Sequence, residues 1–254
     1  MDIGEYRVTE AILQVRGLSR HFGGLTAVDD VSIDVKVGEL HAVIGPNGAG
    51  KTTLINMLSG DLKPSAGSIL FAGNEIAHLA PERRSRFGIG RSYQKVNIFE
   101  AFSALENCRL AAQSRNPRPW HWLREAGSYP ETMRMARRAL ADVGLAGRAA
   151  ATALMLSHGE QRQLEIAMSL ATEPKLLLLD EPLAGLATEE SLKMIALIGG
   201  LAQNHAILLV EHDMDAVFRL ARVLTVMVNG KILASGSPDE VRVNHKVQRA
   251  YLGM

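Results

Sequence analysis

The sequence predicts an α/β fold in which helices flank a mostly parallel sheet, and three apolar runs carry this prediction. Residues 40–44, 176–179 and 206–210 are short and mostly apolar, as strands buried on both faces of a parallel sheet are. Each run is followed directly by glycine or polar residues. Because open α/β sheets bind ligands at the carboxyl ends of their strands, these three strand ends are candidate functional positions.

The first run leads into a phosphate-binding pattern, G-x-x-x-x-G-K-[ST], which a helix over residues 54–58 is expected to continue. The members of this phosphate loop are Gly45, Pro46, Asn47, Gly48, Ala49, Gly50, Lys51, Thr52 and Thr53. Glycines let backbone N–H groups approach an anion, and the helix N-terminus adds partial positive charge. Lys51 is expected to reach the β- and γ-phosphates, and Thr52 to bind magnesium. The alternative, a glycine-rich turn that binds nothing, is disfavoured by the complete pattern.

Composition narrows the class of protein. A formal net charge of +1 over 254 residues gives no polyelectrolyte signature, so nucleic acid is not an expected partner. The single cysteine, Cys108, excludes an internal disulfide and a cysteine metal cluster, and a reduced, cytoplasmic setting is expected. The polar start, residues 1–7, is unlike a signal peptide, and no apolar stretch approaches about 18 residues. Any membrane function is therefore expected to act through partners.

The region before the phosphate loop is expected to contain strands at residues 12–15 and 31–35, the second with clean alternation. Phe22 lies between them beside two glycines. An exposed ring in a turn there could stack on a nucleotide base, and an ordinary core aromatic is the equal alternative. Further on, residues 81–86 suggest a short surface helix with solvated arginines, and residues 87–94 a strand that ends on Gln94.

From about Lys95 the pattern becomes helical. A capping box at Ser103 and Glu106 opens one helix, and a second is expected from Pro130 to Val143. Two further features leave alternatives open. Trp120 and Trp122 belong either to the core of this region, which is favoured, or to an interface. The apolar Ile98, Phe99 and Phe102 form either a partner contact or part of the same core.

A second capping box, Ser157 with Glu160, precedes another apolar-periodic helix. By itself this pattern is simply a helix start, although its N-terminus is another possible anion site. The leucine run at 176–179 then ends on Asp180 and Glu181. Consecutive strand residues point to opposite faces, so one carboxylate is expected to hold magnesium and the other to accept a proton from water. A plain surface turn is the alternative.

The last strand end carries His212, for which a structural histidine and a functional one are equal alternatives. Residues 223–228 and 231–234 flank Asn229-Gly230, which predicts a hairpin.

Taken together and in this order, these motifs resemble the ATP-binding subunits of ABC transporters over nearly the whole chain. The discriminating run is Leu-Ser-His-Gly-Glu-Gln at residues 156–161, which is similar to the family's signature motif and stands shortly before the leucine-rich strand. The resemblance implies a P-loop NTPase core with an antiparallel β subdomain and an inserted α-helical subdomain. Residues 1–95 and 160–254 would form the nucleotide-binding core, and residues 96–159 the inserted subdomain with the signature at its end.

The resemblance also implies roles, with ATP and magnesium as ligands. Phe22 would stack on adenine, and Gln94 would join magnesium and water to the membrane interface. Asp180 would be a magnesium ligand with Thr52 and Gln94. Glu181 would be the general base, and His212 would sense the γ-phosphate. The Lys51 ammonium would bind phosphate. Ser157 and Gly159, in the signature segment, would bind the nucleotide of a partner subunit.

Within the family, the closer resemblance is to the larger ATPase subunit of branched-chain amino acid importers. The runs at 22–28, 180–186, 210–214 and 249–253 carry it. It implies a second ATPase subunit, identical or paralogous, two transmembrane permease subunits, and indirectly a solute-binding protein. The location implied is peripheral, on the cytoplasmic face of the inner membrane.

Two residues depart from the family pattern. His158 stands where glycine or tyrosine is common, and Ala187 stands where the D-loop usually has Asp or Asn. The D-loop contact across a dimer is therefore in question. The alternative function is a soluble ABC ATPase acting on ribosomes or DNA, which commonly has two cassettes or a long coiled coil. A GTPase would carry an Asn-Lys-x-Asp motif, which this sequence lacks.

Overall fold

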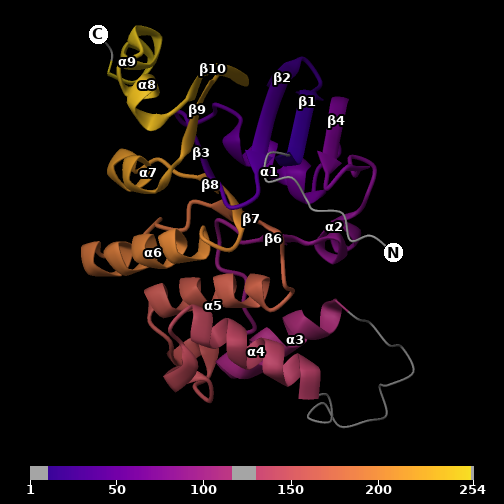
Figure 1. Cartoon of the computed structure of the whole chain (residues 1–254), viewed down its shortest axis with the longest axis vertical. Helices are drawn as coiled ribbons and strands as arrows, with labels where there is room; N and C mark the ends of the chain where they lie inside the picture. The colour runs from indigo at the N-terminus through magenta and orange to yellow at the C-terminus, as the bar shows by residue number, and fades with distance from the viewer. Residues whose placement is uncertain (1–10, 116–129, 253–254) are drawn as a thin grey trace, which may run out of the picture. The chain divides into compact units, whose positions relative to one another are not determined.

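The structure, a computed structural model, describes residues 11–115 and 130–252 (Figure 1). These residues divide into two compact units. Unit 1 holds residues 11–80 and 201–252, and unit 2 holds residues 81–115 and 130–200. The predicted functional division into 1–95 with 160–254 and an insertion at 96–159 is a different partition of the chain, and it stays a prediction. Trp120 and Trp122 lie outside the described residues.

Unit 1 contains an antiparallel sheet with the strand order β2-β1-β4-β5. Its strands are β1 (Ala11–Phe22), β2 (Leu25–Lys36), β4 (Ala66–Phe71) and β5 (Asn74–Glu75). The predicted alternation at residues 31–35 is confirmed, since Val31, Ile33 and Val35 are buried while the residues between them are exposed. An alternating strand covers a core with one face only.

Unit 1 also contains a group of mainly parallel strands in the order β10-β9-β3-β8. These are β3 (Leu40–Ile44), β8 (Ala206–Val210), β9 (Val223–Val228) and β10 (Lys231–Gly236). β3 pairs in parallel with β8 and β9, and every residue of β3 and β8 is buried. The predicted hairpin β9–β10 is confirmed, with positive φ at both Asn229 (49°) and Gly230 (79°), as its two-residue turn requires.

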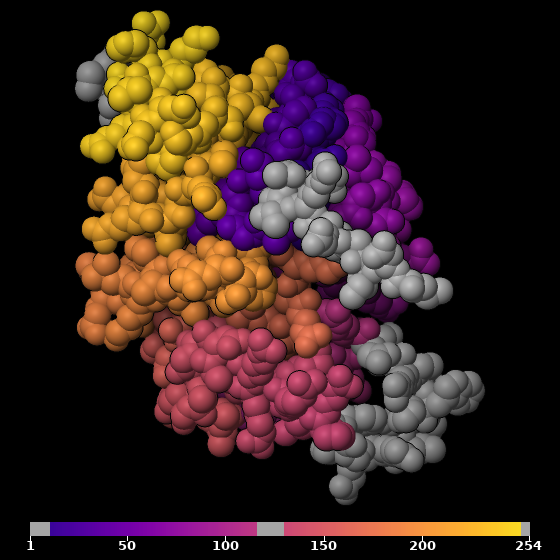
Figure 2. All heavy atoms as spheres, viewed as in Figure 1, coloured from indigo at the N-terminus to yellow at the C-terminus, as the bar shows by residue number. Residues whose placement is uncertain are grey.

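The helices of unit 1 follow these strands. α1 (Lys51–Ser59) comes directly after the phosphate loop and ends at Gly60, while α7 (Met214–Leu220) follows β8. α8 (Pro238–Arg242) packs on β9 and β10, and α9 (His245–Leu252) packs on β10. These last two helices form the yellow part of the surface in Figure 2.

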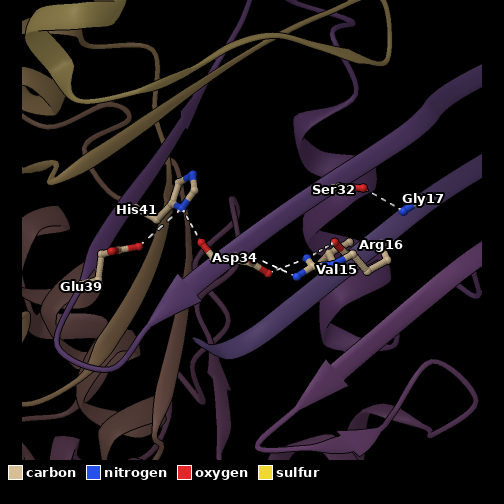
Figure 3. A network of polar contacts seen from close by, with 7 residues as sticks. All are labelled: Val15, Arg16, Gly17, Ser32, Asp34, Glu39 and His41. Carbon is tan, nitrogen blue, oxygen red and sulfur yellow. Dashed lines mark hydrogen bonds and ion pairs between the residues drawn. The ribbon is translucent and has the colours of Figure 1, made fainter. Parts of the chain in front are cut away.

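A polar network joins the two groups of strands in unit 1 (Figure 3). His41 of β3 donates from Nδ1 to the Asp34 carbonyl of β2 (3.1 Å), and its Nε2 accepts from the Thr225 hydroxyl of β9 (2.8 Å). The Asp34 carboxylate in turn accepts two bonds from Arg16, at 2.5 and 2.9 Å. Burial lowers the pKa of His41 to about 4. The ring is therefore neutral at pH 7, and its 3.8 Å approach to Glu39 is not an ion pair there.

Unit 2 contains a short parallel pair and a group of helices. β6 (Ile89–Arg91) pairs with β7 (Leu176–Asp180), and α2 (Pro81–Phe87) precedes β6. α3 (Ala104–Ser114), α4 (Pro130–Asp142) and α5 (His158–Leu170) pack against one another, as Figure 1 shows. α6 (Thr188–Leu201) follows β7. Short 3₁₀ turns at Ala146–Arg148 and Ala153–Met155 lie between α4 and α5.

Both predicted capping boxes are confirmed in full, at Ser103 with Glu106 and at Ser157 with Glu160. The helix expected over residues 81–86 is present as α2, and Arg83 and Arg86 are exposed as expected. Arg84, which was expected to be solvated like them, is only 1% exposed. The strand expected over residues 87–94 is also shorter, because Phe87 ends α2 and β6 stops at Arg91. Local patterns did not distinguish a buried arginine from its exposed neighbours.

Candidate functional site

The phosphate loop of unit 1 requires glycine at two positions for steric reasons. A Cβ on Gly45 would lie 2.3 Å from the Met227 carbonyl oxygen, and one on Gly50 would lie 2.4 Å from that of Ala27. Gly50 also has a φ of 99°, which side chains disfavour. Since both obstacles are backbone atoms, they cannot move aside as a side chain would. The loop therefore keeps its backbone close to the strands beneath it.

The start of α1 has the features of an anion site. Within the described residues, α1 begins at Lys51, and its N-cap residue Gly50 supplies no side-chain hydrogen bond. The first N–H groups of the helix can therefore be satisfied by an anion. Lys51 is buried, and its Nζ donates to the carbonyls of Gly45 (2.7 Å) and Pro46 (3.2 Å). Thr52 is exposed beside it. Uncapped amides, an ammonium and a hydroxyl thus lie within one helical turn, which suits a phosphate group.

The other two site candidates of unit 1 are both exposed. Phe22 lies at the β1–β2 turn, is 46% exposed, and has the Arg20 guanidinium 4.6 Å from its ring centroid. Of the two alternatives for this ring, the structure favours the exposed one. His212 follows β8, and its backbone N–H donates to the buried Glu211 carboxylate at 3.1 Å. The neighbouring Asp213 caps α7, so part of this polar cluster is a helix start.

Unit 2 brings Gln94 and Glu181 together. The Gln94 amide Nε2 donates to Glu181 Oε2 at 3.1 Å across 87 positions of sequence. Glu181 has a φ of 50°, which is uncommon for a residue with a side chain and is typical of functional turns. Asp180, directly before it, is 1% exposed, and one of its oxygens lies 3.8 Å from Arg91 Nη2. The two carboxylates therefore have different surroundings, and their predicted roles stay predictions.

Ser157 and Gly159 lie at the start of α5. Glu190, which the sequence did not indicate as a site residue, lies against them. Glu190 Oε1 accepts from the Ser157 hydroxyl at 3.2 Å and from the Gly159 N–H at 3.3 Å. Its Oε2 accepts from the Ala187 N–H at 3.4 Å. A carboxylate thus already meets the donors that were expected to face a phosphate. The available signal was the position of Glu190 in the first turn of α6, where a capping carboxylate is favoured.

The expected magnesium ligands are Thr52 in unit 1 and Gln94 and Asp180 in unit 2. Hydroxyl, amide and carboxylate oxygens suit this hard cation. Across residues 11–115 and 130–252, no cluster of three His, Cys, Asp or Glu side chains is placed to hold a metal.

A parallel strand followed by a phosphate loop and an uncapped helix, with a signature-like capping box elsewhere in the chain, defines an ATP-binding cassette. Residues 28–184, more than half of the chain, match the family model described as ABC transporter. The chain belongs to this family and is an ABC-type ATPase. Residues 231–253 match a second model, described as branched-chain amino acid ATP-binding cassette transporter.

The curated relatives extend over nearly the whole chain. The chain is 38% identical to the high-affinity branched-chain amino acid transport ATP-binding protein LivG of Escherichia coli, and 39% identical to BraF of Pseudomonas aeruginosa. Both matches cover 97% of this chain and 99% of the relative. A probable LivG of Archaeoglobus fulgidus is 36% identical, with 95% of each protein covered.

Solved structures agree with these relatives. An ATP-binding cassette of an ABC transporter in its ADP conformation matches with a TM-score of 0.85 at 30% identity, covering 97% of this chain and all of that chain. A nucleotide-free cassette matches with a TM-score of 0.84, also at 30% identity, covering 96% of this chain and all of its own. These matches confirm the predicted fold class. The roles of individual site residues stay predictions.

Proposed function

We propose that this chain is the ATP-hydrolysing subunit of an ABC importer for branched-chain amino acids or related amino acids. The observation that carries the proposal is the match of residues 231–253 to the branched-chain amino acid cassette model. That segment lies beyond the region shared with ABC transporters in general, residues 28–184. The full-length relatives named for branched-chain amino acid transport support the same assignment.

The proposed substrate is ATP, bound with magnesium. The N–H groups of the phosphate loop and the Lys51 ammonium would hold the phosphates, and Phe22 would stack on the adenine. Thr52, Gln94 and Asp180 would hold the metal. When bound, magnesium supplies charge neutralisation at the β- and γ-phosphate oxygens. The uncapped start of α1 and the buried position of Lys51 support the phosphate part of this site.

Glu181 would act as the general base that takes a proton from the attacking water. Gln94, whose amide lies 3.1 Å from the Glu181 carboxylate, would orient both the base and the water. Lys51 would stabilise charge on the transferring phosphoryl group, and His212 would sense the γ-phosphate. The exposed His212 side chain, 63% accessible, is compatible with contact to a ligand.

The catalytic cycle would need a second ATPase subunit, identical or paralogous. Ser157 and Gly159 would bind the γ-phosphate held by the partner's phosphate loop, so ATP would close a head-to-tail dimer and hydrolysis would reopen it. We extend the proposal to two transmembrane permease subunits, an indirect solute-binding protein and a peripheral position on the cytoplasmic face of the inner membrane. Within residues 11–115 and 130–252, no helix is long and apolar enough to span a bilayer.

The proposed permease contact lies directly after the Gln94 segment and includes the half-buried Ile98 together with two aromatic residues, Phe99 and Phe102. Their rings stack with centroids 5.6 Å apart, and their exposed fractions are 54% and 42%. Two exposed aromatic rings in contact are typical of an interaction surface. The alternative, that they pack into the core of the helical region, is disfavoured by this exposure.

Isolation of the native complex tests the function and this surface together. Co-purified permeases would support the importer, whereas ribosomes or DNA would support a soluble ABC ATPase. Phe99→Asp is expected to reduce permease recovery about tenfold, because the complex would lose one anchor side chain that is buried on assembly. ATP binding by the isolated subunit is expected to stay unchanged. Intact assembly together with a large loss of thermal stability would instead show that Phe99 is a core residue. Solute identity then follows from binding assays on the solute-binding protein.

A further inference from the structure

A row of side chains on α5 holds the backbone of the segment that carries Gln94. Arg162 donates from Nη1 to the Tyr93 carbonyl (2.8 Å) and from Nη2 to the Gln94 carbonyl (2.6 Å). Glu165 accepts from the Tyr93 N–H at 2.8 Å, and also from the N–H of Asn97. Residues 92–98 have no helix or strand of their own. Four backbone polar groups of this segment are thus satisfied by two side chains of α5.

Arg162 and Glu165 are buried, with side chains 6% and 4% exposed, and they lie 3.5 Å apart on one face of the helix. Burying two charges is costly unless their remaining hydrogen bonds are made. Here, backbone groups of residues 93–97 make most of those bonds, and of these two side chains only Arg162 Nε is without a partner among the described residues. Desolvation raises the pKa of Glu165, and the Tyr93 N–H and the Arg162 charge oppose that rise. Arg162 also uses its planar fork on two successive carbonyls, which lysine cannot reproduce.

The α5 side chains Arg162 and Glu165 connect two parts of the proposed site, the signature segment and the Gln94–Glu181 pair. Ser157, the expected contact with the partner's nucleotide, is the N-cap residue of α5, and Arg162 lies on the same helix. The segment that Arg162 holds places the Gln94 amide 3.1 Å from Glu181. Further along α5, Ser169 donates to the Arg91 carbonyl at 2.8 Å, so the helix follows the backbone from residue 91 to residue 97.

We propose that Arg162 and Glu165 are positioning residues for hydrolysis. They fix the Gln94 amide against Glu181 and transmit movement of the signature helix α5 to it. The inference rests on the proposed function, since Gln94 and Glu181 matter only if ATP is hydrolysed here. A purely structural role would make the pair important for folding but not specifically for turnover.

The matched control is Arg115, which also donates to two successive carbonyls in unit 2, those of Thr172 and Glu173. That turn lies beyond the other end of α5. Each of the two substitutions to lysine keeps the positive charge. Arg162→Lys loses the fork of Nη1 and Nη2, whereas Arg115 makes both of its bonds from Nη1 alone. We expect Arg162→Lys to lower kcat about tenfold, with KM for ATP within about twofold, because positioning acts on the transition state. Arg115→Lys is expected to keep the kcat of the parent protein.

Two further readouts separate positioning from stability. In a Gln94→Ala background, Arg162→Lys is expected to have no further effect on kcat, since the residue acts through Gln94. Amide exchange at residues 93–97 is expected to rise in Arg162→Lys and not in Arg115→Lys. Glu165→Gln, which keeps one acceptor oxygen and the side-chain size, gives the same test if Arg162→Lys does not fold. It is expected to lower kcat less than Arg162→Lys does.

The outcomes separate a failure of the proposed function from a failure of the positioning role. A parent protein that does not hydrolyse ATP overturns the proposed function. An active parent with equal kcat in the Arg162→Lys and Arg115→Lys variants overturns the positioning role alone. Additive effects of Gln94→Ala and Arg162→Lys also overturn it, because independent sites add.

Discussion

The phosphate loop and the Gln94–Glu181 pair are built in different ways. The loop is a local structure: nine consecutive residues, Gly45 to Thr53, lie between a strand and a helix, and glycines fit where Cβ atoms would meet backbone oxygens. The Gln94–Glu181 contact joins residues 87 positions apart, and α5 supports it through Arg162 and Glu165. The donors of the anion site thus come from one short segment, whereas the Gln94–Glu181 contact is assembled from elements far apart in the sequence.

The largest expected effect falls on the assembled region. Glu181→Gln keeps the shape of the side chain and removes its ability to take a proton, so turnover should fall by about 10²–10⁴-fold. Nucleotide binding should persist, and the protein should accumulate as an ATP-bound dimer. ATPase rates, equilibrium binding and size-exclusion chromatography with ATP measure all three. A monomeric and fully active variant would contradict both the base role and the dimer cycle.

The loop is tested by Lys51→Ala. Removing the ammonium deletes a positive charge at the transferring phosphoryl group, and we expect about a 10²–10³-fold loss of hydrolysis. Because the loop is local, contacts in unit 2 should be unaffected, and amide exchange of residues 93–97 should match that of the parent. Hydrolysis at the parent rate would show that the phosphate site lies elsewhere.

Substitutions at the start of α5 are expected to have a smaller effect on the protein, and they can either strengthen or block ATP-driven dimerisation. Glu190 already accepts from Ser157 and Gly159, so it competes with a phosphate and adds negative charge. Glu190→Gln is expected to strengthen ATP-driven dimerisation several-fold, because one unit of charge repulsion is removed. Ser157→Arg should block dimerisation while the monomer still binds ATP. Sedimentation at several ATP concentrations measures both, and weaker dimerisation in Glu190→Gln would show that the carboxylate supports the site.

Sequence reasoning succeeded where structure is local. The phosphate loop, both capping boxes, the alternating strand at residues 31–35 and the Asn229-Gly230 hairpin each depend on neighbours within a few positions. It failed where burial is decided by distant elements. Arg84 was expected to be solvated and is buried, and the partners of Ser157 and of the Gln94 backbone come from elsewhere in the chain. No local pattern specifies which helix will lie against residues 93–97.

The network around His41, which joins β2, β3 and β9, is another region assembled from distant elements. It can be tested through the pH dependence of the free energy of unfolding. The pKa of the buried ring is about 4 in the folded protein, below the ordinary value of 6.5, and desolvation is the main cause. On acidification the unfolded chain therefore takes up the proton first. The stability contributed by neutral His41 is complete above pH 6.5 and is lost as the pH falls towards 4. The full loss is on the order of 3 kcal/mol.

His41→Gln removes this titration and keeps a donor and an acceptor for the Asp34 carbonyl and the Thr225 hydroxyl. The variant is expected to be less stable than the parent at pH 7, and the difference should shrink between pH 6.5 and pH 4. The hydrogen bond to the Asp34 carbonyl opposes the shift, so the lowered pKa of the His41 ring reflects its burial. His78→Gln, at an exposed histidine, serves as the control for a histidine-to-glutamine change at the surface. Chemical unfolding at several pH values measures these differences, and a parallel offset between the parent and His41→Gln at every pH would show that His41 contributes by packing alone.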